Sequence, residues 1–176
     1  MNTTKWAIDP THSEIGFKVK HMMFTNVSGK FDQYDGSIET EENDFTTAKV
    51  SFAASIDSID TRNTDRDNHL KSADFFDAEQ FPTLNFKSTN IQGNGSEYEI
   101  TGDLTIKGIT KLVTLNAEFS GLMTDPWGNT KVGLNLDGKI NRKDFGLTYN
   151  AALETGGVLV GEDVKLNAEI QLVEQK

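Results

Sequence analysis

The amino-acid sequence predicts an all-β protein, in which about eight mostly antiparallel strands form a closed barrel or a sandwich, with one short helical insertion. Apolar residues recur at every second position along most of the chain, and clusters of Gly, Asn, Asp and Pro separate these runs. Alternation with a period of two is the pattern of a strand with one buried face. About eight such runs in one chain are typical of barrels and sandwiches.

The alternating runs begin near the N-terminus, where Ile15, Phe17 and Val19 are separated by Gly and Lys. Two further strands are expected in 27–39 and 83–89. The other runs each keep one phase of apolar or small residues: Val50, Phe52, Ala54 and Ile56; Tyr98, Ile100, Gly102, Leu104 and Ile106; Val113, Leu115, Ala117 and Phe119; Val132, Leu134, Leu136 and Ile140; Val164, Leu166, Ala168, Ile170 and Leu172. Side chains in these phases are expected to face the interior.

Turn-forming residues lie between the predicted strands. Clusters at 92–96, 125–129 and 155–157 combine Gly with Asn, Asp, Pro or Thr, and such residues favour tight reversals. A short segment at Gly108 joins two alternating runs, which is the length that a hairpin connection requires. We therefore expect neighbouring strands to be mostly antiparallel.

The segment from Arg62 to Phe86 interrupts the strand pattern. We expect a short helical insertion at about residues 61–80, in which Asp60 or Thr61 caps a first helix. Ser72 is expected to cap a second helix, which ends before Phe81 because the residue before a proline avoids helical backbone angles.

The insertion also carries three aromatic residues, Phe75, Phe76 and Phe81, within a short stretch of chain. Burying one Phe side chain is worth about 1.5 to 3 kcal/mol, so leaving three in water would forgo a large stabilisation. The insertion is therefore expected to lie over an open end or an edge of the β structure.

Composition limits the classes of function. No linker, repeat or low-complexity tract divides the 176 residues, so we expect one domain, residues 1–176. With 17 Lys and Arg against 27 Asp and Glu the net charge is −10, which repels phosphate backbones and disfavours nucleic acid as a partner. The absence of Cys excludes disulfides and thiolate metal sites.

No apolar run in the sequence approaches the roughly 20 residues of a membrane helix, and the first residues do not resemble a signal peptide. We therefore expect no integral membrane span. The chain as it stands is expected to be cytoplasmic, or periplasmic if a signal peptide has been removed from it.

Several small residues occupy positions that are expected to face inward: Ala54, Gly102, Ala117, Gly138 and Ala168. Eight-stranded barrels either fill their interior with side chains or hold one small ligand. Small inward residues leave space and favour a cavity, although they also occur where a barrel tapers.

Four sequence blocks resemble the YceI-like family, the bacterial polyisoprenoid-binding proteins with a lipocalin-like barrel. The blocks are WAIDPTHSEIGFKVKHMMFTNVSGKFDQYDGSI, RNTDRDNHLKSADFFDAEQFPTLNFKST, GDLTIKGITKLVTL and INRKDFGL, and the match runs from about Trp6 to about Leu172. The resemblance implies an extended eight-stranded antiparallel barrel with a helical insertion, commonly a homodimer, around an elongated apolar tunnel for an isoprenoid or similar long-chain lipid. Leu112 departs from the family pattern, where Pro is common, and this change is expected to leave the hairpin intact.

The resemblance makes the segment from Arg62 to Phe86 the cover of the barrel near its ligand entrance. We expect the apolar chain of the ligand to contact ten residues: Phe17, Val19, Phe52, Phe75, Phe76, Phe81, Phe86, Leu104, Ile106 and Phe119. We expect its polar end to contact five: His21, Arg62, Arg66, Asp67 and His69.

Two interpretations of the charged part of the insertion stay open. In the first, Arg66, Asp67 and His69 form a hydrogen-bonded network that fixes the helical turns, because Arg and carboxylate groups form strong, directional pairs. In the second, Arg62, Arg66 or Lys71 binds a polar lipid headgroup through charge-assisted hydrogen bonds. Each basic residue has an acidic residue nearby in the sequence, which favours the first interpretation.

The three histidines, His12, His21 and His69, are too far apart in the sequence for a local metal motif, and no metal or cofactor is expected. His21 continues the phase of the first alternating run, so its ring is expected to enter the barrel, either as a satisfied core residue or as a contact to a ligand head. The apolar run at 22–24 suits lipid contact, core packing, a dimer contact or a lip of the entrance.

The sequence favours a non-catalytic carrier for a long-chain isoprenoid or similar amphiphilic lipid. Ser13 and Ser72 lie near histidines but lack the Gly-x-Ser-x-Gly pattern of a nucleophile elbow. Two alternatives stay open: an enzyme that acts on a lipid-like substrate in the same cavity through the His69 region, and a stress-linked interaction protein whose barrel is fully packed.

Overall fold

Most of the secondary-structure elements of the protein are β-strands. The structure is a computed structural model that describes residues 2–22, 25–150 and 160–176. Within these residues the strands are β1 (Thr3–Ile8), β2 (Glu14–His21), β3 (Thr25–Phe31), β4 (Tyr34–Glu41), β5 (Asp44–Ser55), β6 (Ile59–Asp60), β7 (Thr83–Asn94), β8 (Glu97–Ile106), β9 (Ile109–Thr124), β10 (Thr130–Asn141) and β11 (Val160–Gln175). The helices are α1 (Thr64–Lys71) and three short 3-10 helices, η1 (Pro10–His12), η2 (Ile56–Ser58) and η3 (Arg142–Phe145).

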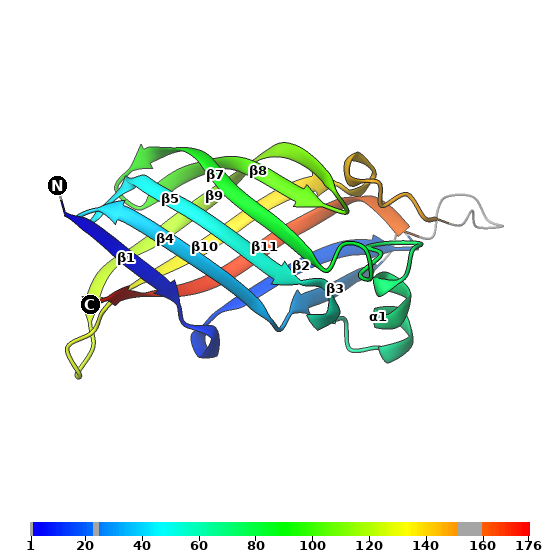
Figure 1. The fold of residues 1–176 in the computed structure, drawn as a ribbon, viewed down its shortest axis with the longest axis horizontal. Helices are drawn as coiled ribbons and strands as arrows, with labels where there is room; N and C mark the ends of the chain where they lie inside the picture. The colour runs from blue at the N-terminus through cyan, green and yellow to red at the C-terminus, as the bar shows by residue number, and fades with distance from the viewer. Residues whose placement is uncertain (1, 23–24, 151–159) are drawn as a thin grey trace.

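The strands form a closed, eight-stranded antiparallel barrel (Figure 1). Around the ring the order is β1, β4, β5, β7, β8, β9, β10 and β11, and pairing of β1 with β11 closes it. The start of β1 and the end of β11 lie at one end of the barrel, and α1 lies at the other (Figure 1). The predicted barrel with a helical insertion is confirmed.

Toward the α1 end, three further strands extend the wall. β2 pairs with β11 beyond the part that β1 occupies, β3 pairs with β2, and β6 pairs with β3. The 3-10 helix η1 interrupts the strand direction between β1 and β2. The carboxylate of Asp9 accepts hydrogen bonds there from the backbone N–H and the hydroxyl of Thr11. Pro10 begins this turn and has no N–H to donate to a neighbouring strand, so the interruption falls there.

The predicted turns at 92–96 and 125–129 and at Gly108 are confirmed as hairpin connections within the described residues. Lys107 and Gly108 both have positive φ, 53° and 76°, as a two-residue hairpin turn requires, and they join β8 to β9. Gly93, near the end of β7, and Gly95, in the turn between β7 and β8, both have positive φ. The predicted turn at 155–157 lies outside the described residues.

The insertion contains one helix rather than the two that we expected. α1 is capped by Asn63, whose side chain accepts a hydrogen bond from Arg66 N at 3.0 Å. The two residues that we expected to cap the helix make other hydrogen bonds. The carboxylate of Asp60 accepts one from the backbone N–H of Arg62, and the backbone N–H of Thr61 donates one to Asp67.

Ser72 ends α1 instead of starting a second helix. Its hydroxyl donates to the carbonyl of His69, and its carbonyl accepts from the backbone N–H groups of Phe75 and Asp77. Residues 73–80 therefore form a series of turns, and the prediction of a second helix is wrong.

The inward-facing small residues do not all leave empty space. A Cβ atom added to Gly102 would lie 2.6 Å from the ring of Phe86, and one added to Gly138 would lie 2.5 Å from Leu115. Large side chains of neighbouring strands already occupy these positions. The expectation that Gly102 and Gly138 open space for a cavity is therefore wrong, although a cavity does exist elsewhere in the interior.

Candidate ligand-binding site

An apolar cavity of about 240 Å³ lies inside the barrel. Its walls are almost entirely carbon, and they come from strands on every side of the ring and from the insertion. The lining runs from Leu134 and Leu172 at one end to Phe75, Leu147 and Val160 at the other. The cavity is therefore elongated along the barrel.

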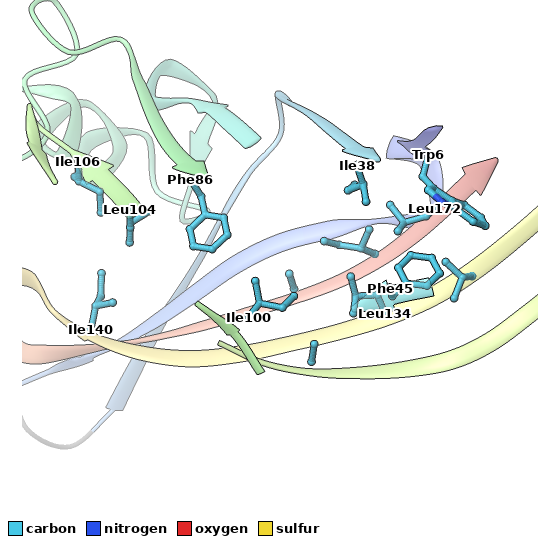
Figure 2. Packing of buried hydrophobic residues seen from close by; sticks show 14 of the residues in the cluster. Trp6, Ile38, Phe45, Phe86, Ile100, Leu104, Ile106, Leu134, Ile140 and Leu172 are labelled. Atoms are coloured by element: carbon cyan, nitrogen blue, oxygen red, sulfur yellow. The ribbon is translucent and has the colours of Figure 1, made fainter. Parts of the chain in front are cut away.

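Figure 2 shows the buried residues of this interior in two groups. Trp6, Phe45 and Leu172 lie together toward one end, and Leu104, Ile106 and other side chains lie toward the other, with Ile100 between them. Both groups belong to one continuous apolar core. The cavity lies within this core rather than on the outer surface of the sheet.

One end of the cavity is closed by four aromatic residues, Trp6, Phe45, Tyr98 and Phe119, which we call the aromatic plug. The ring centroids are 5.2 Å apart for Trp6 and Phe45, 4.8 Å for Phe45 and Phe119, and 4.9 Å for Tyr98 and Phe119. The indole N–H of Trp6 donates to the hydroxyl of Thr40 at 3.1 Å, which satisfies the polar atom of a buried ring.

The other end lies under the insertion. Leu70, Phe75 and Phe76 line the cavity there, and Phe75 is buried. The ring of His69 stands edge-on to Phe75 and to Tyr149, with centroids 5.1 Å and 4.8 Å away. These contacts join the insertion to the chain that follows η3.

Most of the apolar residues that we expected to contact a ligand lie on the cavity. Eight of the ten line it: Phe17, Val19, Phe52, Phe75, Phe76, Phe86, Leu104 and Ile106. Their contact with a ligand stays a prediction.

The other two, Phe81 and Phe119, do not line the cavity. Phe119 belongs to the aromatic plug. Phe81 packs against the hairpin between β8 and β9, where a Cβ atom on Gly108 would lie 2.9 Å from its ring. Alternation shows that a side chain faces inward, but it does not show whether that side chain lines the cavity or packs against other core residues.

None of the five residues predicted for the polar end lines the cavity, so the structure gives no support to their contact with a ligand inside it: His21, Arg62, Arg66, Asp67 and His69. The side chain of Arg62 is exposed, and His21 is half-buried at the end of β2, opposite Thr25 and Val160. Of the apolar run at 22–24, Met23 and Phe24 lie outside the described residues.

Arg66 and Asp67 are linked through Thr61, a buried residue that is 3% exposed. Arg66 donates from Nε to the Thr61 hydroxyl at 2.8 Å and from Nη2 to the Thr61 carbonyl at 2.6 Å. Asp67 accepts from the backbone N–H of Thr61 at 2.9 Å and from its hydroxyl. This geometry favours the first interpretation, a network that fixes the insertion.

His69 is not part of that network, contrary to our expectation. Its Nε2 atom lies 2.9 Å from a carboxylate oxygen of Asp74, and 42% of its side chain is exposed. Because His69 lies off the cavity, its position gives no support to an enzyme that uses this residue on a substrate held inside the barrel.

Sequence reasoning missed Arg142, which lines the cavity and is only 3% exposed. Its guanidinium donates to four backbone carbonyls: from Nε to Gly161 at 2.8 Å, from Nη1 to Leu147 and to Tyr149 at 2.9 Å, and from Nη2 to Val160 at 3.3 Å. Burial lowers the pKa of Arg142, and the charge of Glu162 acts in the opposite direction.

The signal for Arg142 was weak because it follows the alternating part of its strand, in the block INRKDFGL. An Arg beside Lys143 and Asp144 has the local composition of an exposed turn. Only the fold shows that η3 turns this side chain inward, toward backbone carbonyls that all follow it in the chain, at residues 147, 149, 160 and 161.

Two other features are absent from the described residues, a metal site and a membrane-spanning helix. No three His, Asp or Glu side chains there are placed to hold a metal ion together. No helix in the same residues has the length and apolar character to cross a membrane.

The sequence model of the YceI-like domain family matches residues 6–172. The chain belongs to the YceI-like domain family. This YceI-like chain is 43% identical over 169 residues to the UPF0312 protein SAS2572 of Staphylococcus aureus strain MSSA476, and the alignment covers 96% of each chain. It is also 32% identical to the YCEI protein of Campylobacter jejuni, whose crystal structure superposes with a TM-score of 0.78 over 89% of this chain and 90% of that one.

Two more distant YceI-like barrels share the fold. BcnA of Burkholderia cenocepacia has a TM-score of 0.80 at 20% identity, over 93% of this chain and 98% of that one. A polyisoprenoid binding domain from Saccharophagus degradans has a TM-score of 0.66 at 13% identity, over 95% and 97% of the two chains. At these identities the likeness shows the fold alone.

Proposed function

We propose that this protein is a non-catalytic carrier that holds a long-chain isoprenoid, or a similar amphiphilic lipid, in the cavity of its barrel. The observation that carries the proposal is the elongated cavity, whose walls offer a ligand almost nothing but carbon. A cavity of this kind favours an apolar chain over water, because water needs polar partners to stay in it. The polyisoprenoid binding domain that shares the fold supports an isoprenoid as the occupant.

The cavity also argues against a fully packed barrel. An apolar cavity of about 150 Å³ is large enough to bind benzene, and this one is about 240 Å³. Each methylene group moved from water to such a site contributes about 0.8 kcal/mol, so about ten carbons contribute roughly 8 kcal/mol. That gain is comparable with the roughly 4 to 15 kcal/mol that association costs, so a longer chain is needed for tight binding.

The first experiment is native mass spectrometry of the purified protein, followed by extraction with organic solvent and identification of what is released. A long-chain lipid in a fixed ratio to the protein is expected. Protein that is empty and also takes up no added geranylgeraniol or geranylgeranyl phosphate would contradict the proposal.

A pair of variants on β9 tests whether the cavity is the binding site. Val113 lines the cavity, whereas the next residue, Leu112, points outward and is 65% exposed. Val113→Phe is expected to fill the cavity and weaken uptake of the added lipid, and Leu112→Phe is expected to leave uptake unchanged. Equal uptake by both variants, with each shown to be folded by circular dichroism, would place binding elsewhere.

A further inference from the structure

Arg142 brings a positive charge to a cavity that otherwise has apolar walls. The residue is 3% exposed and lines the cavity at the end where Leu147 and Val160 also line it. Among the described residues, no carboxylate lies within ion-pair distance of its guanidinium. A buried charge is costly unless another charge compensates it, so an unpaired one is unusual.

The four carbonyl groups around Arg142 fix its position without neutralising it. They accept from four of the five N–H groups that a guanidinium carries, and a carbonyl is a dipole with no net charge. Glu162, the acid whose charge acts on the pKa of Arg142, is half-exposed and forms an ion pair with Lys143 at 2.7 Å. The positive charge of Arg142 therefore acts on the cavity interior, where the low dielectric constant strengthens its attraction for a negative group.

Within the described part of the chain, the opposite end of the cavity has no such buried charge. The aromatic plug there consists of Trp6, Phe45, Tyr98 and Phe119, and none of these carries a charge. Among the described residues that line the cavity, the other charged residue is Asp137, whose side chain is exposed and accepts a hydrogen bond from Asn116 on the outer face. The two ends of the cavity therefore differ in electrostatic character.

We infer that the cavity binds an amphiphile with an acidic head, a carboxylate or a phosphate, and that the head lies at Arg142 while the chain points toward the aromatic plug. This inference rests on the proposed function and adds the charge and the orientation of the ligand. A guanidinium is well suited to either head, because its planar N–H groups match carboxylate and phosphate oxygens.

The test compares acids with alcohols of the same chain in the unmodified protein. N-phenyl-1-naphthylamine, a neutral probe that fluoresces in apolar sites, is displaced with two matched pairs: geranylgeranyl phosphate with geranylgeraniol, and palmitate with hexadecanol. The acid of at least one pair is expected to bind about tenfold or more tightly than its alcohol, as a hydrogen bond to a charged group provides. The pair with the larger ratio identifies the head as phosphate or carboxylate.

Two charge-matched variants show whether Arg142 causes the preference. Arg142→Gln is expected to bring the ratio of acid to alcohol affinity close to one, whereas Arg62→Gln, which removes the same charge from an exposed site off the cavity, is expected to leave the ratio unchanged. Circular dichroism checks that each variant is folded. If Arg142→Gln does not fold, the ratio of acid to alcohol affinity in the unmodified protein still tests whether the cavity prefers an acidic head.

The outcomes separate this inference from the proposed function. Equal affinity for acid and alcohol in the unmodified protein, or a ratio that survives in folded Arg142→Gln, would overturn the inference and leave the carrier function standing. Arg142 would then serve only to join the chain at Leu147 and Tyr149 to the start of β11. Failure of all four lipids to bind would overturn both.

Discussion

The ring of Phe86 on β7 lies over Gly102 on the neighbouring strand β8. A Cβ atom on Gly102 would come within 2.6 Å of this ring and within 2.5 Å of the Lys87 carbonyl oxygen. The same arrangement recurs where Phe17 lies over Gly29, at 2.3 Å from an added Cβ atom. Phe86 and Phe17 both line the cavity, so these glycines allow large aromatic side chains to lie flat along the wall.

Gly102→Ala is therefore expected to destabilise the protein by about 1 to 3 kcal/mol, because a methyl group in a filled space forces the ring or the backbone to move. Urea unfolding measures the change in the free energy of unfolding. Gly161→Ala is the control, since an added Cβ atom there has its nearest neighbour at 3.4 Å, an ordinary contact. Equal stability of the two variants would mean that the Phe86 ring can leave Gly102 at little cost.

Thr61→Val is expected to lower the free energy of unfolding by about 1 to 3 kcal/mol, because it leaves part-buried polar groups of Arg66 and Asp67 without the hydroxyl that they share. Thermal and urea unfolding measure the loss. Thr64→Val, at an exposed position on α1, is the control and is expected to change stability by no more than about 0.5 kcal/mol. If lipid uptake falls while stability stays constant, the network belongs to the binding site after all.

Asp125 is expected to make stability depend on pH in the acid range. Hydrogen bonds from Asn129, with the nearby Lys131 and Trp127 N–H, hold its pKa at about 2, below the ordinary value of 3.8. Because the pKa is lower in the folded state, the stabilisation is complete above the unfolded pKa of about 4. It is lost as the pH falls from about 4 through 2.

The variant Asp125→Asn isolates this contribution. The difference in melting temperature between the unmodified protein and the variant is expected to be constant near neutral pH and to shrink as the pH falls below about 4. Asp9, whose pKa is also about 2, is present in both proteins and cancels in the difference. A difference that does not change between pH 6 and pH 2 would contradict the low pKa.

The sequence was sufficient for the barrel because most strands alternate apolar and polar residues, and alternation determines which face is buried. It did not show β1, and the strand expected in 27–39 is two strands, β3 and β4. It was also sufficient for the apolar lining, since residues such as Val19 and Leu104 follow that phase onto the cavity. The polar end could not be found in this way. Arg66 and Asp67 stand out by composition yet bond to Thr61, whereas Arg142 becomes part of the cavity only through the path of the chain after β10.

The aromatic plug is expected to set the length of chain that the cavity accepts. Phe119→Ala removes a ring that packs on Phe45 and Tyr98, so it is expected to lower stability by about 3 kcal/mol and to open space beyond the end of the cavity. Native mass spectrometry with an equimolar mixture of isoprenyl phosphates of increasing length is expected to show a shift toward longer chains. Phe81→Ala, which removes another half-buried ring that lies off the cavity, is expected to lower stability without this shift. The same chain-length profile in both variants would mean that the plug does not limit the ligand, and that the chain ends before it reaches Phe119.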